Sequence, residues 1–158
     1  MSTNKQQQYE QQITEARAKL ETFLNGLSDE EWETFIFSEE QNWRVGDIVS
    51  HLVENERAMS IHIYRIRQGR ETVPTDFDID QWNEGLRERM GTPSRAELME
   101  GLKTVRVRTL EGLAQVEDGD WELEGHHPLR QKITVAQYYE TIAFHDLSHM
   151  EDIKKALG

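Results

Sequence analysis

The sequence contains no cysteine, and this absence removes several kinds of chemistry at once. A chain without thiols forms no disulfide, holds no zinc–thiolate site and offers no thiol nucleophile of its own. Any sulfur atom that attacks a substrate must therefore come from a low-molecular-weight thiol.

The chain also lacks long apolar runs and an excess of positive charge. No stretch approaches the roughly 20 apolar residues of a membrane span, and residues 1–8 have no apolar centre of a secretory signal. The formal net charge is −12, which disfavours binding to a nucleic-acid backbone or an anionic membrane. We therefore expect a cytoplasmic protein that binds neither nucleic acid nor membrane.

Proline is scarce as well, and most of the chain follows helical periodicity. Apolar residues recur at spacings of three and four over residues 5–27, 44–68, 98–116 and 134–157. The segments 33–43 and 70–79 are expected to be loops, and so is the stretch from Gly125 through Pro128 that leads to Thr134. The strand-like pieces at residues 33–37 and 121–123 are too short to argue from. The pattern predicts an all-α fold, a four-helix bundle with long connections, as a single domain over residues 1–158.

Capping signals mark where the predicted helices begin. Ser28 and Ser94 each precede a glutamate by three residues, which is the spacing of a capping box. Thr134 is the expected N-cap of the last helix. Asp80 is expected to cap a short helix that ends at Gly91.

A faint internal repeat links the two halves of the chain. An acidic turn with a tryptophan, Trp32 or Trp121, ends the first and the third long helix. Each turn is followed by a loop and then by a helix that opens with Val45 or Val135. Two similar helical hairpins about a pseudo-twofold axis would bring the second and fourth long helices together.

The last helix carries two histidines, His145 and His149, in its apolar stripe. Residues four apart lie on one face of a helix, so the two imidazoles can share a metal ion. Burying them without partners costs roughly 1–3 kcal/mol per group, a cost that a shared ion removes. His51 projects to one side of the second helix's stripe and is the candidate third ligand. The alternative for each histidine is a hydrogen-bonded core residue.

The other histidines are expected to have lesser roles. His62 lies on nearly the same face as His51 but about 16 Å further along the helix, so we expect it to pack or to line a groove. His126 and His127 precede a proline and are expected to be exposed loop residues that can approach the site as a lid.

The sequence also suggests roles for three polar residues near the candidate ligands. Asp146 follows His145 and is expected to be solvated or to support a ligand rather than to bind the metal. Glu56 is the nearest candidate for a general base on its helix, with pairing to an arginine as the simpler alternative. Asn55 is one turn beyond His51, where it is expected to orient a water molecule or a substrate.

With these residues in view, the chain resembles the DinB/YfiT-like superfamily of metalloenzymes, which includes mycothiol- and bacillithiol-dependent transferases. The matching stretches are Trp43-Arg-Val-Gly-Asp-Ile-Val-Ser-His51, Thr134-Val-Ala-Gln and Phe144-His145-Asp-Leu-Ser-His149. Asp80-Gln-Trp-Asn83 and Pro93-Ser-Arg-Ala-Glu-Leu98 resemble the branch with maleylpyruvate isomerase-like N-terminal domains. The resemblance implies a homodimeric four-helix bundle that holds a divalent metal ion, zinc or nickel, on His51, His145 and His149. Some thiol transferases of the family have a carboxylate at the position of His145, so an all-imidazole set is a departure from them.

Two classes of function remain open on this reading. The first is a divalent-metal-dependent enzyme of the thiol S-transferase or hydrolase kind that acts on a small-molecule substrate, with a low-molecular-weight thiol as cosubstrate in the transferase case. The second is a non-catalytic dimeric bundle that binds a ligand or a partner and has a vestigial metal site. No catalytic general base is identified from the sequence.

Overall fold

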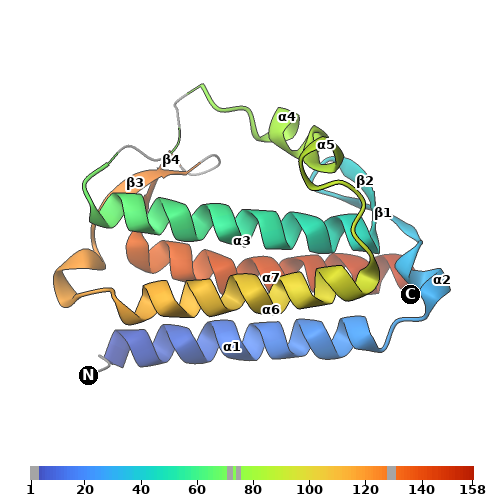
Figure 1. Ribbon diagram of the computed structural model, residues 1–158, viewed down its shortest axis with the longest axis horizontal. Coiled ribbons are helices and arrows are strands. Elements are labelled where there is room, and N and C mark those ends of the chain that lie inside the picture. Colours follow the sequence, from blue (N-terminus) through green and yellow to red (C-terminus); the bar gives the residue numbers. More distant parts are fainter. Residues whose placement is uncertain (1–3, 71–72, 74–75, 128–130) are drawn as a thin grey trace.

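Four long helices form the body of the molecule. The computed structural model describes residues 4–70, 73, 76–127 and 131–158. The long helices are α1 (Asn4–Asn25), α3 (Val45–Arg67), α6 (Arg95–Ala114) and α7 (Val135–Leu157). Both α1 and α3 pack against α6 and α7. The predicted all-α four-helix bundle is confirmed (Figure 1).

The order of the helices requires a long connection. In Figure 1, α1 and α7 run in one direction, whereas α3 and α6 run in the opposite direction. Because α3 and α6 are parallel neighbours, the chain between them must return along the bundle. It does so through two short helices, α4 (Ile79–Glu84) and α5 (Leu86–Met90). Pro74, within this predicted loop, lies outside the described residues.

Two of the predicted loops contain β-hairpins. Strand β1 (Phe35–Ser38) pairs antiparallel with β2 (Gln41–Arg44), and β3 (Glu124–His127) pairs with β4 (Gln131–Thr134). The expectation of plain loops was wrong because strands of four residues show too little alternation to be recognised. A short helix, α2 (Asp29–Trp32) or η1 (Asp118–Asp120), precedes each hairpin. The faint sequence repeat thus corresponds to a repeated order of elements.

Most of the predicted helix starts are confirmed. Ser28, Ser94 and Thr134 each accept a hydrogen bond from the amide three residues later, and each forms a capping box. The prediction for Asp80 was wrong, because Asp78 is the N-cap and accepts from the amide of Asp80. The acidic alternation in this segment offers several capping candidates, and the helix begins at an earlier one.

The bundle interior contains two apolar clusters with buried charges between them. One cluster includes Ile13 on α1, and the other includes Leu20 on the same helix. Between these positions lies Arg17, which is buried. We call the charged group at this level the ionic layer; it consists of one residue from each long helix, namely Arg17, Glu56, Arg106 and Asp146.

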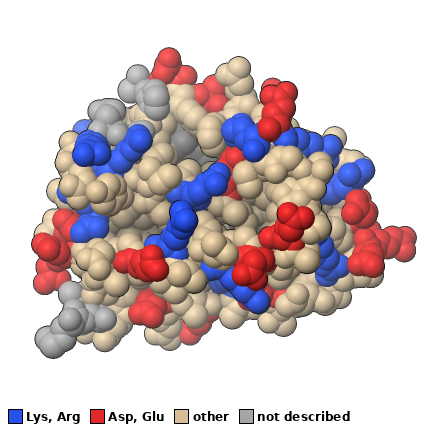
Figure 2. Space-filling view, in the orientation of Figure 1, with Lys and Arg blue, Asp and Glu red and all other residues tan. Residues whose placement is uncertain are grey.

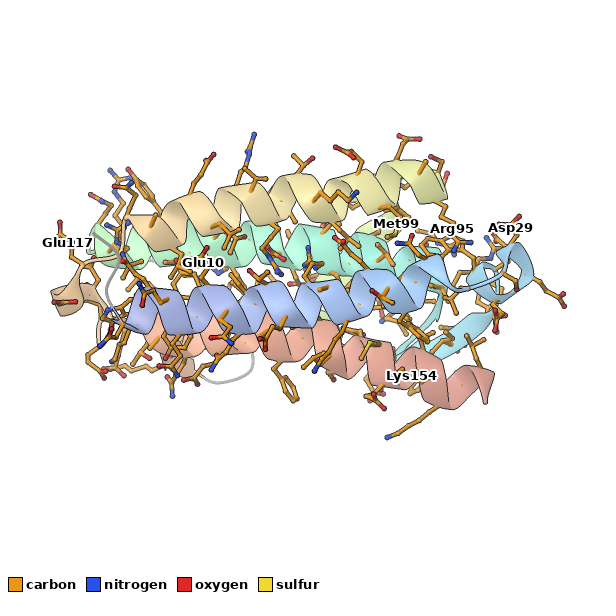
Figure 3. The ribbon with its side chains drawn as sticks, turned by 90° about the horizontal axis from the view of Figure 1, so that it is seen from below. Glu10, Asp29, Arg95, Met99, Glu117 and Lys154 are labelled. Atoms are coloured by element: carbon orange, nitrogen blue, oxygen red, sulfur yellow. The ribbon has the colours of Figure 1, made fainter. Side chains whose placement is uncertain are left out.

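Charged side chains on the outside are mixed in sign. Acidic and basic residues are interspersed over the face shown in Figure 2. Figure 3 shows Asp29 and Arg95 at one end of the bundle and Glu117 at the other. Arg95 pairs with Asp29 at 3.4 Å and so connects the start of α6 to α2. Among the described helices, none is long and apolar enough to cross a membrane.

Candidate metal centre

The three predicted histidines meet where α3 packs against α7. Nε2 of His145 lies 3.2 Å from Nε2 of His51 and 3.0 Å from Nε2 of His149. His51 and His149 are fully buried, and His145 is half-buried. Helical periodicity had assigned all three side chains to faces that can converge, and the structure brings them together.

A carboxylate that sequence reasoning missed joins the three imidazoles. Oε1 of Glu39 lies 3.1 Å from Nε2 of His145 and 3.0 Å from Nε2 of His149, and Oε2 lies 3.1 Å from Nε2 of His51. The donor atoms of the four residues all lie within 4.8 Å of one another. We call Glu39, His51, His145 and His149 the histidine cluster.

A strained turn directs Glu39 into the cluster. Glu39 and Glu40 connect β1 to β2 and have φ angles of 49° and 62°. A two-residue hairpin turn with both φ values positive favours Asn-Gly, and a non-glycine residue in this region costs about 1–3 kcal/mol. From α4, Nδ2 of Asn83 contacts Oε2 of Glu39 at 3.3 Å. The pair Glu-Glu carries no hairpin signal, so the sequence gives no local indication that Glu39 joins the three histidines.

The tautomer of His149 follows from its neighbours. The hydroxyl of Ser38 donates its one proton to Oδ2 of Asp152 at 2.8 Å. Oγ of Ser38 also lies 3.0 Å from Nδ1 of His149, so Nδ1 must carry the proton of that contact. Nε2 of His149 therefore directs a lone pair at the Glu39 carboxylate. Two acceptors face each other at 3.0 Å.

Asn55 contacts the other deeply buried ring. Nδ2 of Asn55 lies 2.9 Å from Nδ1 of His51, and the ring of Trp43 lies 4.8 Å from the His51 ring. The same amide nitrogen lies 3.1 Å from Nε2 of His51, so Asn55 contacts both ring nitrogens. Asn55 thus holds the His51 ring, and it also lines the pocket beside the cluster, so the expected role toward water or substrate stays a prediction.

The pKa values in the cluster favour a carboxylate beside neutral imidazoles. Burial lowers the pKa of His51 to about 4, although the hydrogen bond with Glu39 opposes this shift. Burial also lowers the pKa of His149. For Glu39, burial acts to raise the pKa, but hydrogen bonds from His145 and His51 hold it well below its usual value. In the metal-free protein the cluster therefore presents a carboxylate together with the Nε2 lone pair of His149.

The donor set fits a small divalent cation. Imidazole nitrogens bind zinc at about 2.0–2.1 Å, so neighbouring donors around a tetrahedral ion lie about 3.3 Å apart. The donor contacts in the histidine cluster measure 3.0–3.2 Å. Imidazole also suits nickel, and a carboxylate suits either ion.

A pocket of about 210 Å³ opens beside the cluster. Glu39 and His145 form one end of its lining, and His62, His127 and Tyr138 also belong to the lining. The expectation that His62 lines a groove is confirmed. The expected full exposure of His126 and His127 was wrong, because both are half-buried in β3.

Glu56 and Asp146 both pair with arginines of the ionic layer. Arg106 contacts Oε2 of Glu56 through Nε at 2.8 Å and Oδ2 of Asp146 through Nη2 at 3.1 Å. Arg17 contacts both carboxylates as well. Burial acts to raise the pKa of Glu56, but the two guanidinium groups hold it below its usual value. Pairing of Glu56 with arginine is confirmed, and the expectation of a solvated Asp146 was wrong because its partners come from distant helices.

The fold and this centre define a class: a helical bundle with a buried cluster of three histidines and one carboxylate. The model of the DinB superfamily matches residues 12–153, and the chain belongs to this superfamily. The uncharacterized protein YuaE of Bacillus subtilis (strain 168) is 27% identical over an alignment of 154 residues. The match covers 87% of this chain and 91% of YuaE.

Solved structures show the same fold. YfiT from Bacillus subtilis, described as a probable metal-dependent hydrolase with an unusual four-helix bundle topology, has a TM-score of 0.76 and 18% identity. The match covers 99% of this chain and 87% of YfiT. The mycothiol-dependent maleylpyruvate isomerase has a TM-score of 0.73 and 16% identity, with 92% of this chain and 60% of that chain covered. At these identities the likeness establishes the fold.

Proposed function

We propose that the protein binds a divalent metal ion, zinc or nickel, in the histidine cluster and acts on a small molecule as a metal-dependent hydrolase or thiol S-transferase. The observation that carries this proposal is the contact between Nε2 of His149 and Oε1 of Glu39 at 3.0 Å. Asp152 and Ser38 fix the proton of His149 on Nδ1, so no proton is left to join the two acceptors. A cation bound between them removes this repulsion.

The three histidines and two neighbouring residues would have different roles in metal binding. His51, His145 and His149 would hold the ion, while Asn55 and Ser38 fix the orientation of two of the rings. A divalent ion bound there lowers the pKa of a water or thiol ligand. Because the chain has no cysteine, the thiol of the transferase alternative is a low-molecular-weight cosubstrate.

Glu39 is the donor that we propose to be exchangeable. Catalytic zinc sites keep one position open, whereas four protein donors complete a tetrahedral structural site. The side chain of Glu39 is 34% exposed, lines the pocket and lies on the strained turn, unlike the two deeply buried imidazoles. Displacement by a substrate would leave its carboxylate beside the reacting group as a proton acceptor.

The second candidate is a non-catalytic bundle, and the four-donor set is the observation that favours it. If Glu39 stays in place, the site is closed, and the ion serves the fold or the binding of a partner. The two candidates differ in whether the metal-loaded protein turns over a substrate.

Metal analysis tests the proposal first. After loading with zinc or nickel and dialysis, the wild type should retain a stoichiometric amount, and His51→Ala, His145→Ala and His149→Ala should each lose it. His62→Ala, which alters the pocket outside the cluster, should retain the metal. A wild type that binds no stoichiometric metal would overturn the proposal.

Turnover then separates the two candidates. The metal-loaded protein is assayed with simple esters and with bacillithiol, mycothiol and glutathione. Metal-dependent turnover supports the enzyme, and Glu39→Gln should then keep the metal but change the rate. Tight binding without turnover supports the non-catalytic bundle.

A further inference from the structure

The pocket beside the histidine cluster extends along the groove between α3 and α7. Its α3 wall runs from Asn55, next to His51, to His62, a length of about 10 Å. Because α7 runs antiparallel to α3, Tyr138 lies at the His62 end and His145 at the cluster end. A ligand with one group at the cluster therefore reaches His62 with its other end.

The far end of the pocket presents hydrogen-bond acceptors. The hydroxyl of Tyr138 donates to the carbonyl oxygen of His126 at 3.0 Å. Its oxygen also lies 3.4 Å from Nδ1 of His62, so Nδ1 supplies the proton of that contact. Nε2 of His62 then carries a lone pair, and within the described residues no donor meets it. The hydroxyl of Thr141, also in the lining, donates to the carbonyl oxygen of Gln137 at 2.8 Å and keeps its lone pairs for a ligand.

The charges around His62 favour a neutral group at this end. Burial and the nearby Arg65 lower the pKa of His62, so its ring is neutral at pH 7. A carboxylate would be attracted by the exposed Arg65, but it would meet the lone pairs of His62 and Thr141 and gain no hydrogen bond from them, which opposes that attraction. An ammonium group would be repelled by Arg65.

We propose that the pocket selects an elongated neutral small molecule whose far end carries a hydrogen-bond donor, a hydroxyl or amide N–H, which donates to Nε2 of His62. The middle of such a molecule lies against the apolar side chains of Met59 and Phe144. The inference rests on the proposed function for the other end, which is directed at the metal. A donor placed at the far end satisfies an acceptor that a donor-free analogue leaves unpaired, and this difference gives selectivity.

Three thiol probes of one chain length test the inference. Mercaptooctanol, its O-methyl ether and mercaptooctanoic acid are titrated into cobalt(II)-loaded protein, with the thiolate-to-cobalt absorption band as the readout. Mercaptooctanol should bind about fivefold more tightly than the ether, because only the alcohol has the proton for His62. It should also bind more tightly than the acid.

Two variants on α3 and one control assign the effect to His62. His62→Phe should abolish the preference for the alcohol over the ether, and His62→Gln, which restores an acceptor, should recover it. Tyr64→Phe changes an exposed side chain of the same helix and should leave the preference unchanged. Equal affinities of alcohol and ether for the wild type would overturn the inference, as would a preference that survives in His62→Phe.

The failure of this inference is distinguishable from the failure of the proposed function. Cobalt d–d absorption reports metal binding separately. If the protein binds cobalt but does not prefer the alcohol, the inference about the far end of the pocket is contradicted and the proposed metal binding is not. If no cobalt binds, octanol and its methyl ether are compared in the metal-free protein by tryptophan fluorescence. The same preference for the alcohol supports the inference, and equal binding overturns it.

Discussion

The ionic layer and the histidine cluster are both buried polar groups that connect α3 to α7, but they differ in completeness. In the ionic layer two guanidinium groups face two carboxylates, and each oxygen of Glu56 and Asp146 accepts a hydrogen bond. In the histidine cluster a lone pair of His149 faces the carboxylate of Glu39. The comparison separates two kinds of buried polarity: in the closed set every charged group is paired, whereas the open set leaves two acceptors facing each other that a cation would satisfy.

Breaking the closed set should have the largest effect. Arg106→Met leaves Glu56 and Asp146 in the interior with one guanidinium between them, and removing one partner of a buried ion pair costs about 3–5 kcal/mol. The free energy of unfolding, measured with urea, should fall by about this amount.

An exposed ion pair is the control for that variant. Arg87 pairs with Asp47 at 2.7 Å on the surface, and Arg87→Met should change the free energy of unfolding by less than about 1 kcal/mol. Similar losses in the two variants would show that the ionic layer is no more important than a surface pair.

The histidines of the histidine cluster should lose their stabilising contribution at a higher pH than Glu56 of the ionic layer. The pKa of His51 falls to about 4 in the folded state, below the ordinary value of 6.5, so the unfolded chain takes up the proton first. In the metal-free protein, the neutral His51 ring therefore contributes to the free energy of unfolding above pH 6.5. This contribution, up to about 3 kcal/mol, is lost as the pH falls toward 4. The lowered pKa of Glu56 affects stability at a lower pH, because the contribution of its carboxylate to the free energy of unfolding is lost only below the ordinary value of 4.5.

Urea unfolding between pH 7 and pH 4 checks this prediction. His51→Phe should flatten the upper part of the pH dependence and leave the loss below pH 4.5 in place. An unchanged slope between pH 6.5 and 4.5 in this variant would show that His51 does not set it.

The sequence predicts residues on long helices better than residues that act through distant partners. His51, His145 and His149 were predicted to converge because helical periodicity over twenty or so residues fixes which face each side chain occupies, and the structure brings them together. The same periodicity predicts the four long helices. Asp146 was misjudged because its partners Arg17 and Arg106 lie 129 and 40 residues away in the sequence. No local pattern encodes such a pairing.

Glu39 was missed for a different physical reason. It lies on a turn between strands of four residues, where neither periodicity nor an Asn-Gly pair marks the hairpin. Its direction depends on a strained backbone and on a contact with Asn83, 44 residues away. Completing the site therefore required the tertiary structure.

Removing the hydroxyl that contacts His149 should lower the metal affinity of the histidine cluster moderately and leave the ionic layer unchanged. Ser38→Ala removes the acceptor that fixes the proton of His149 on Nδ1, and loss of such a partner reduces metal affinity by about 10–100-fold. Competition with a chelator measures the affinity. Ser60→Ala, beside the ionic layer and 3.0 Å from Oγ1 of Thr109, should leave the metal affinity unchanged. A similar loss in both variants would contradict the separation of the two sets.

The smallest effect concerns the backbone that carries Glu39. Among the described residues, the non-glycine positions with positive φ are Glu39 and Glu40, so this strain lies beside the histidine cluster and not at the ionic layer. Glu40→Gly relieves it at an exposed position without altering Glu39, and should raise the free energy of unfolding by about 0.5–1 kcal/mol. Glu10→Gly, on the exposed face of α1, should lower it by about 1 kcal/mol. Urea unfolding measures whether the free energy of unfolding rises or falls in each variant. A loss of stability in Glu40→Gly would show that the turn holds no strain for a glycine to release.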